Sequence, residues 1–301
     1  MKPVHELTEH LLDNSEEFNG EFFRRFHWRR APEPLQLSPS ISKDYLFPVL
    51  LDRVTCAVGV FLCDYKKAAS LIATNLSDRI KPVGMTGGRA LVGISAYQYN
   101  KVLGMKPYNE IALALPVMVN TRLRPPILPL FSRSFRRFGY YIAAMFVTSE
   151  ENTIRGRKIW GLPKITRELE FLQEGEDMVT LAREENGEEA LRLVTPRTGG
   201  AAVSLHERSF LYTRHNGLFL RSPTEFQARF NIRKNIKALF GQKGFPGGTR
   251  LTIGQGPSMR EFRELEIDPE PLQTRYTENM QSSFDLPDSN PPAWLTELNA
   301  V

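Results

Sequence analysis

A lysine directly after a predicted helix is the residue of this chain best suited to act as a nucleophile. Residues 151–165 read Glu-Asn-Thr-Ile-Arg-Gly-Arg-Lys-Ile-Trp-Gly-Leu-Pro-Lys-Ile, a pattern that predicts a short helix ending at Gly161 and Pro163. Lys164 follows on backbone stiffened by the proline, with apolar neighbours on both sides. Burial among apolar groups lowers the pKa of a lysine. A neutral amine can then attack a carbonyl carbon and form a Schiff base.

A glutamate at the start of an apolar run is the second candidate for chemistry. Residues 108–119 begin Tyr-Asn-Glu and continue as a long run of apolar side chains, which predicts a strand. Because side chains alternate along a strand, Tyr108, Glu110, Ala112 and Ala114 share one face, and the small alanines leave space for a ligand. The opposite face carries Ile111, Leu113 and Leu115. Glu110 can accept and donate the protons that Schiff-base formation requires.

Together these segments resemble the motifs of the acetoacetate decarboxylase superfamily. The run from Gly156 to Lys164 is similar to its Gly-Arg-Glu…Pro-Lys signature, whose lysine forms the Schiff base. The Tyr-Asn-Glu sequence ending at Glu110 is similar to the family's Tyr-x-Glu strand, which supplies the active-site carboxylate. Arg53, just before the predicted strand 54–62, resembles an arginine at the start of an early strand in the family. The resemblance runs from about residue 50 to residue 195.

The resemblance implies a fold and a set of site residues. The fold is mainly β (α+β), a cone-shaped antiparallel β-barrel with a few short helices, assembled as a homo-oligomer. The implied catalytic residues are Lys164 and Glu110, and the implied substrate-binding residues are Arg53, Arg157, Tyr108 and Trp160. Arg53 or Arg157 would orient the substrate carboxylate, although Arg157 could equally anchor the helix through an internal salt bridge. For Trp160 we favour packing over chemistry.

One departure from the family pattern bears on the reaction. Many members carry a second lysine directly after the Schiff-base lysine, where this chain has Ile165. A neighbouring cation lowers the pKa of the nucleophile, an effect known from acetoacetate decarboxylase itself. That contribution is missing at position 165, but desolvation by Ile165, Leu162 and Trp160 could lower the pKa of Lys164 by itself.

Three functions therefore stay open. The first is a carboxy-lyase that decarboxylates a small, acetoacetate-like β-keto acid through a Schiff base. The second keeps the imine but performs aldol and dehydration chemistry on a pyruvate-like keto acid. The third is a non-catalytic binding module with the same fold, which would contact an anionic partner through the basic segments 22–30 and 122–138.

The remaining pattern predicts many strands and few helices. Strands are expected at 54–62, 89–99, 108–119, 140–147, 167–173, 178–184, 189–194, 210–215 and 218–221. Asn186-Gly187 and Asn216-Gly217 indicate hairpin turns, and Asp64 is a plausible N-cap for a helix at 65–73. A basic helix is predicted from about 226 to 240, and a Pro- and Arg-rich loop from 122 to 137. We divide the chain into an N-terminal arm (1–45), a β domain (46–290) and a C-terminal tail (291–301).

Composition narrows the setting. The chain has 301 residues and a formal net charge of +5, a mild excess that suits an anionic small substrate, and no nucleic-acid-binding module is recognised. The longest apolar runs are half of the roughly 18 residues that a transmembrane helix needs, and no secretory signal is visible, so we expect a cytoplasmic protein.

Cys56 and Cys63 should face opposite sides of one strand, without a disulfide. We expect neither a metal nor a cofactor, because His and Cys show no ligand spacing and no phosphate loop is present.

Overall fold

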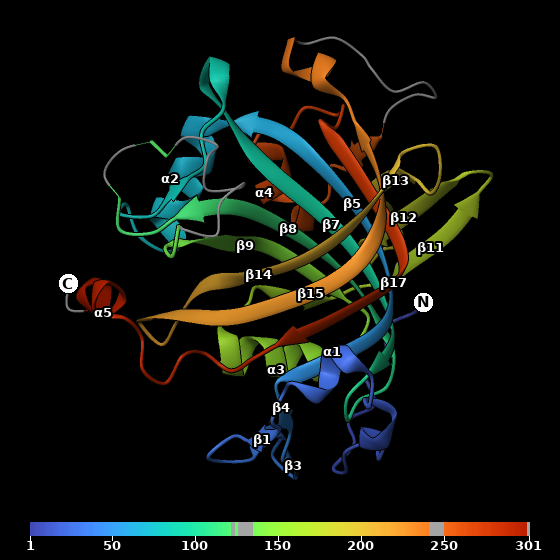
Figure 1. The fold of residues 1–301 in the computed structure, drawn as a ribbon, viewed down its shortest axis with the longest axis vertical. Helices are drawn as coiled ribbons and strands as arrows, with labels where there is room; N and C mark the ends of the chain where they lie inside the picture. The colour runs from blue at the N-terminus through green and yellow to red at the C-terminus, as the bar shows by residue number, and fades with distance from the viewer. Residues whose placement is uncertain (122–123, 126–134, 241–249, 300–301) are drawn as a thin grey trace.

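Seven long strands form a closed barrel, which the computed structural model shows in Figure 1. The structure describes residues 1–121, 124–125, 135–240 and 250–299. The barrel strands in this part of the chain are β5 (Val49–Asp64), β7 (Arg89–Val102), β8 (Tyr108–Met118), β9 (Phe138–Val147), β14 (Ala201–His215), β15 (Leu218–Lys234) and β17 (Gln273–Phe284). They follow the order β9-β14-β15-β17-β5-β7-β8, and a pairing between β8 and β9 closes the ring. The predicted barrel is therefore confirmed.

One seam of the barrel is parallel, so the barrel is mixed where the resemblance implied an antiparallel one. Strands β14 and β9 pair in parallel, with Leu211 opposite Tyr140. The other neighbouring pairs in the ring are antiparallel. At the seam, Gly139 allows close approach, because a Cβ at this position would lie 2.5 Å from the Phe210 carbonyl oxygen.

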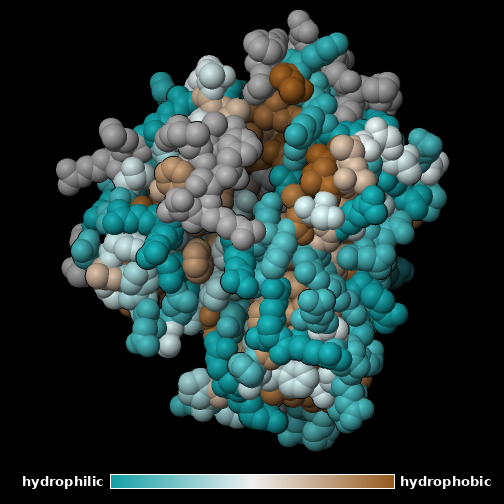
Figure 2. Space-filling model, viewed as in Figure 1, coloured by the Kyte–Doolittle hydropathy of each residue, from teal (hydrophilic) through white to brown (hydrophobic). Residues whose placement is uncertain are grey.

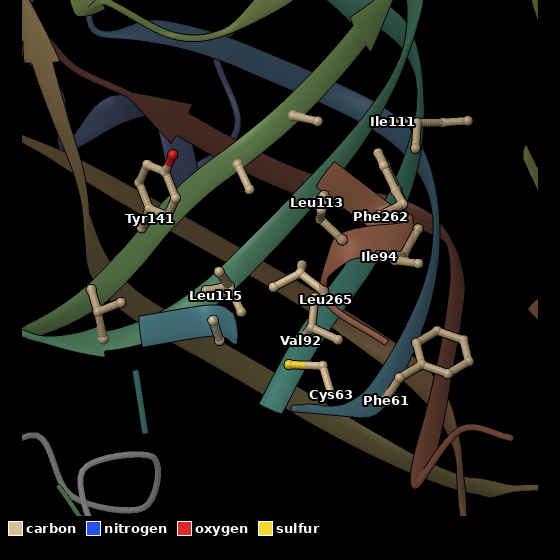
Figure 3. Close-up of a cluster of buried hydrophobic side chains, with 14 of the residues drawn as sticks. Phe61, Cys63, Val92, Ile94, Ile111, Leu113, Leu115, Tyr141, Phe262 and Leu265 are labelled. Carbon is tan, nitrogen blue, oxygen red and sulfur yellow. The ribbon is translucent and has the colours of Figure 1, made fainter. Parts of the chain in front are cut away.

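A second sheet and several short helices cover the outside of the barrel. The sheet contains β11 (Leu169–Glu174), β12 (Asp177–Arg183), β13 (Glu189–Pro196) and β16 (Leu251–Ile253). The helices are α2 (Tyr65–Asn75), η5 (Pro257–Met259), α4 (Arg260–Glu264) and α5 (Ala293–Asn299). Outward-facing side chains of the barrel strands pack against these elements and form the largest buried hydrophobic cluster, part of which Figure 3 shows. The largest part of the core thus lies outside the barrel wall, and a second buried cluster lines the inside of the barrel around a cavity.

Local signals explain most of the boundaries. The Asp64 side chain accepts a hydrogen bond of 2.8 Å from the Lys67 backbone amide, so the predicted cap of α2 is confirmed. Asn216 and Gly217 both have positive φ and join β14 to β15 in a two-residue turn. The remaining helices and strands after residue 80 are β6 (Lys81–Pro82), η2 (Thr86–Gly88), α3 (Glu150–Trp160), β10 (Lys164–Thr166) and η4 (Ile236–Phe240).

The basic helix predicted for residues 226–240 is wrong. Strand β15 continues to Lys234, and only η4, a short 3₁₀ helix, follows it. Phe226, Ala228, Phe230 and Ile232 recur at every second residue, which is the period of a strand. The predicted end of that helix near residue 241 and most of the predicted 122–137 loop lie outside the described residues.

The N-terminal residues pack on one end of the barrel, the lower end in Figure 1. They form η1 (Ser15–Glu17), α1 (Glu21–Arg24), β1 (Arg29–Arg30), β2 (Leu35–Ser38), β3 (Ile41–Lys43) and β4 (Leu46–Phe47). Phe18, Phe22 and Phe23 are buried against Leu50 and Leu103 of the barrel. These aromatic residues of the predicted arm thus stabilise its contact with the β domain.

Three further expectations, on the two cysteines, a membrane-spanning helix and a metal site, can be compared with the described residues. Cys56 and Cys63 are free thiols on opposite sides of the barrel wall, as predicted, with Cys56 facing inward and Cys63 in the outer core. Within the described ranges, no helix combines the length and hydropathy needed to span a membrane. The same ranges contain no group of three or more His, Cys, Asp or Glu side chains placed to hold a metal ion.

Candidate active site

The inside of the barrel holds a cavity of about 550 Å³. Along β8 the residues that line it are Tyr108, Glu110, Ala112, Ala114 and Pro116. The alternate residues Ile111, Leu113 and Leu115 point into the outer core, where Figure 3 labels them. The two faces predicted for this strand are therefore confirmed, and Glu110 lies in the cavity wall.

Helix α3 ends in a geometry that delivers Lys164 to this cavity. Gly161 adopts a left-handed conformation (φ 63°), and the amides of Gly161 and Leu162 donate to the carbonyls of Arg157 and Gly156. The bond from Gly161 to Arg157 is that of an αL helix cap, which a glycine at this position favours. The chain then runs into β10, where Lys164 pairs in parallel with Met145 of β9. The predicted helix stop thus sets the position of the lysine.

Gly156 makes room for the lysine side chain. A Cβ at this position would lie 2.5 Å from Cδ and 2.8 Å from Cε of Lys164. Any larger residue would push the aliphatic stem of Lys164 away from the helix. The glycine of the Gly-Arg pair therefore leaves room for the observed path of the Lys164 side chain.

The amine of Lys164 is buried and held by two acceptors. Lys164 is 5% exposed, and its Nζ donates to Oε2 of Glu110 at 2.8 Å and to Oδ1 of Asn152. Glu110 is also 5% exposed and accepts a second hydrogen bond, 3.1 Å long, from the Tyr99 hydroxyl. The nucleophile and the carboxylate predicted from separate motifs are thus in direct contact.

Burial lowers the pKa of Lys164, and nearby charges modify this effect. Glu110 opposes the shift through its charge and its hydrogen bond, whereas the positive charge of Arg155 lowers the pKa further. The cation that Ile165 fails to supply therefore comes from another part of the chain, one helical turn and a loop before the lysine. Desolvation, which the sequence suggested as a sufficient cause, is the largest contribution, and Arg155 adds a smaller one in the same direction.

Arg155 is a cation in the cavity wall that forms no ion pair with any of the residues described in the structure. It is 2% exposed, and aromatic rings surround its guanidinium, with the Tyr45 centroid at 4.7 Å and the Trp160 centroid at 5.5 Å. Within the described residues, no carboxylate lies within ion-pair distance of Arg155, and its Nε has no hydrogen-bond partner. A buried guanidinium of this kind can bind a substrate carboxylate.

Two predicted substrate-binding residues lie outside the cavity. Arg53 is exposed at an irregularity of β5, where its φ is 50°, and it lines a separate shallow pocket with Asn100 and Glu278. Arg157 is exposed, and its Nε donates to the Lys164 carbonyl at 2.6 Å. Arg157 thus anchors the backbone of the nucleophile, the second of the two roles considered for it, although the acceptor is a carbonyl and the bond is no salt bridge.

Tyr108 and Trp160 do line the cavity. The Tyr108 ring centroid lies 6.0 Å from Nζ of Lys164. Trp160 is stacked on Phe284 with centroids 4.6 Å apart, and its Nε1 donates to the Asp285 carbonyl at 2.8 Å. The contacts of Trp160 are therefore mainly packing contacts, as the sequence analysis favoured.

Asn152 and Arg155 were missed by the sequence reasoning. With Gly156 they occupy positions i, i+3 and i+4 of α3, which places the three on one face of a helix. The family motif includes Gly156. The helical spacing of Asn152 and Arg155 from Gly156 was therefore the signal that could have identified these two residues.

Comparisons with known proteins agree with this geometry. The family model described as acetoacetate decarboxylase matches residues 32–284. A crystal structure of acetoacetate decarboxylase from Legionella pneumophila is similar at 12% identity, with a TM-score of 0.57 and coverage of 86% of this chain and 90% of that one. Another acetoacetate decarboxylase structure gives 12% identity, a TM-score of 0.52, and coverage of 80% and 87%.

A third similar structure is the enduracididine biosynthesis enzyme MppR complexed with pyruvate. It shares 11% identity with this chain, with a TM-score of 0.52 and coverage of 84% of this chain and 96% of that one. No curated protein matches the sequence. In this chain the barrel encloses a buried lysine and a buried glutamate that are in contact. The chain belongs to the acetoacetate decarboxylase family.

Proposed function

We propose that this chain is a carboxy-lyase that forms a Schiff base between Lys164 and a β-keto acid and releases carbon dioxide. The observation that carries the proposal is the buried contact of 2.8 Å between Nζ of Lys164 and Glu110 inside the cavity. Burial lowers the pKa of Lys164, which favours the neutral amine. The cavity also contains the Cys56 thiol, but burial raises its pKa to about 12, so the reactive thiolate is disfavoured there.

The first half of the reaction forms the imine. The neutral Nζ of Lys164 attacks the keto carbon, and the carbonyl oxygen gains protons and leaves as water. Glu110 is close enough to take a proton from Nζ and return it to the departing oxygen. Asn152, the second acceptor on Nζ, orients the amine toward the substrate.

The second half breaks the carbon–carbon bond. The protonated imine accepts the electron pair of the bond to the carboxylate, carbon dioxide leaves, and an enamine remains. The enamine carbon takes up a proton, and water hydrolyses the imine to release a ketone and free Lys164. Arg155 binds the substrate carboxylate before this step, in place of Arg53 and Arg157, because it lies in the cavity wall and no carboxylate of the described residues forms an ion pair with it.

An aldolase-dehydratase is the second candidate, supported by the likeness to MppR, which was solved with pyruvate. In a pyruvate-like acid the carboxylate is bonded directly to the keto carbon. Its imine therefore has no carboxylate on the neighbouring carbon that could leave as carbon dioxide. Its imine would instead lose a methyl proton, and the enamine would attack an aldehyde. Product mass separates the two reactions, since only the first releases carbon dioxide.

Borohydride trapping tests the proposal. The protein is incubated with acetoacetate, and separately with pyruvate, in the presence of borohydride, and adducts are mapped by peptide mass spectrometry. We expect a reduced adduct on Lys164 and none in Lys164→Ala. Lys158→Ala, which removes an exposed lysine of α3, is the control that should still label. Turnover retained by Lys164→Ala would contradict the proposal, and no adduct with either acid would favour a non-catalytic binding module.

A further inference from the structure

The cavity extends well beyond the groups that would handle the keto acid itself. On β8 its lining runs from Glu110 to Pro116, about 20 Å along the strand. Its volume of about 550 Å³ falls in the range of roughly 300 to 1,000 Å³ that holds drug-sized ligands. Acetoacetate has a single methyl group beyond its keto carbon and would leave most of this space unfilled.

The wall beyond the reacting groups is mainly apolar. Several barrel strands contribute to it. Its apolar residues away from Lys164 include Val58, Val60, Leu91, Ala114, Phe230 and Leu272. Contact with such a wall stabilises a hydrocarbon chain, because each methylene group removed from water contributes favourably.

The cavity reaches the surface at the end opposite Lys164. Ile236 both lines the cavity and is 66% exposed, and the exposed Lys234 lies beside it in the sequence and in the lining. Figure 2 shows hydrophobic residues gathered at the upper end of the molecule, where Figure 1 places the end of β15. A chain attached to a substrate at Lys164 therefore has an apolar path to the surface.

The charged groups along this path carry opposite signs. Glu207 and Arg275 both line the cavity and act in opposite directions on the pKa of Tyr140, which is raised chiefly by burial. Arg275 also donates to the Gln273 side chain at 2.6 Å. Glu207 and Arg275 offset each other in charge. The other described cation in this part of the lining, Lys234, is exposed to water at the opening, whereas Arg155 is buried.

Resting on the proposed function, we infer that the substrate is a β-keto acid with a long alkyl tail. Its keto acid head lies at Lys164, Glu110 and Arg155, and its tail lies along the apolar wall toward Ile236. The product would be a long-chain methyl ketone. The substrate class is thus a fatty β-keto acid, with acetoacetate as a short analogue.

A chain-length series tests this inference. The rates of borohydride-trapped adduct formation and of carbon dioxide release are measured for acetoacetate, β-oxooctanoate and β-oxododecanoate, below their micellar concentrations. We expect kcat/KM to rise by roughly fourfold for each methylene group that becomes buried. A long acid with a terminal carboxylate should be a poorer substrate than its methyl-ended counterpart, and the reverse order would overturn the inference.

Substitutions at Ala114, an inward residue of β8, locate the tail. The series Ala114→Val, Ala114→Leu and Ala114→Phe progressively fills the cavity between Glu110 and Ile236. We expect the ratio of kcat/KM for β-oxododecanoate over acetoacetate to fall stepwise, by at least tenfold for Ala114→Phe. Ala114→Ser, which adds only a hydroxyl, is the matched control. A general loss of folding would lower both rates and leave the ratio unchanged.

The outcomes separate the inference from the proposed function. If acetoacetate labels Lys164 and the longer acids react no better, the inference is overturned and the carboxy-lyase stands. If no acid labels Lys164 at any chain length, the proposed function fails and the inference fails with it. If Ala114→Phe keeps its rate with acetoacetate and the chain-length ratio is unchanged, the inference is also overturned, because the tail would then lie elsewhere.

Discussion

Two charged residues act on the pKa of Lys164 in opposite directions. Burial lowers this pKa, the negative charge of Glu110 raises it, and the positive charge of Arg155 lowers it again. Under the proposed function, attack on a carbonyl needs the neutral amine, so we expect the rate of imine formation to rise as the pH increases through the pKa of Lys164. Burial has the largest influence on this pKa, and the two neighbours adjust it in opposite directions.

Removing either charge should move the pH profile in a known direction. Arg155→Met removes a cation, so the pKa of Lys164 rises and the midpoint of labelling moves to higher pH. Glu110→Gln removes an anion, and the midpoint moves to lower pH. Labelling with acetone and borohydride measures both, because this neutral ketone needs no carboxylate site. Arg155→Lys keeps the charge and should keep the midpoint, and equal shifts in the three variants would contradict this account.

Gly156→Ala should separate activity from stability. Alanine has the higher helix propensity, by up to about 1 kcal/mol, yet its Cβ would lie 2.5 Å from Cδ of Lys164. We expect at least tenfold slower labelling of Lys164, with a melting temperature equal to or above that of the parent. Lys158→Ala, on the exposed side of the same helix, is the control for labelling. Normal labelling in Gly156→Ala would show that the lysine can take another path.

For single residues, the sequence was informative at positions where the proposed chemistry allows only one or two residue types. Lys164 and Glu110 could be predicted from a motif and from strand alternation, because both signals are local. Arg155 could not be told apart from Arg157, since the face of α3 that meets the cavity depends on how the helix docks. Arg53 was misplaced because a left-handed residue interrupts the strand pattern that the prediction assumed.

At the scale of secondary structure, the parallel pairing of β9 with β14 is one of the contacts that the closed ring of the barrel requires. These strands approach closely at Gly139, where a Cβ would lie 2.5 Å from the Phe210 carbonyl and 2.6 Å from the Tyr212 ring. The seam is formed by residues far apart in sequence, so no local pattern in β9 or β14 predicts it. The sequence predicted most strands and both hairpin turns, but it could not predict which strands close the barrel.

Gly139→Ala should destabilise the fold through this seam. The added methyl group must displace backbone and an aromatic ring, and overpacking of this kind costs about 1–3 kcal/mol. Gly93→Ala is the matched control, because its Cβ would meet only the Ala114 carbonyl at 3.8 Å. We expect the control to be neutral or stabilising by roughly 0.5–1 kcal/mol, as for other strand glycines. Urea unfolding of both variants measures the difference, and equal midpoints would mean that the seam tolerates the methyl group.

Strand β15 shows how a basic composition can hide a strand. Its lysines and arginines suggested a helix, although Phe226 and Phe230 both line the cavity at an even spacing. The polar residues between them face the outside of the barrel. The period of the apolar residues was the better guide than the overall composition.

For the molecule as a whole, the N-terminal residues and α3 form one connected unit. Nζ of Lys43 lies 2.6 Å from Oε1 of Glu151, with side-chain exposures of 2% and 11%, and the Tyr45 hydroxyl donates to the same oxygen at 2.6 Å. Tyr45 also places its ring against Arg155. The segment before the barrel thus holds the helix that carries the site residues.

Lys43→Met should therefore reduce global stability. Removing one partner of a buried ion pair leaves the other charge unpaired, and this costs about 3–5 kcal/mol. Lys106→Met is the control, because the pair of Lys106 with Glu6 has exposures of 65% and 67%, and such surface pairs contribute about 0–1 kcal/mol. Chemical denaturation should show a lower midpoint for Lys43→Met only. Similar midpoints would indicate that the N-terminal segment is held by its apolar contacts alone.

The alternation along β8 has a consequence for how such a protein can diverge. Residues that point outward pack in the largest buried cluster, whereas those that point inward line the cavity, and among these Ala114 and Pro116 lie away from Lys164. Mutations at inward positions away from Lys164 can therefore accumulate with little effect on folding, and each changes which molecules fit. Selection can then adjust substrate preference and fold stability on separate sets of residues of the same strand. A lineage could in this way acquire a new substrate while its lysine chemistry stays unchanged.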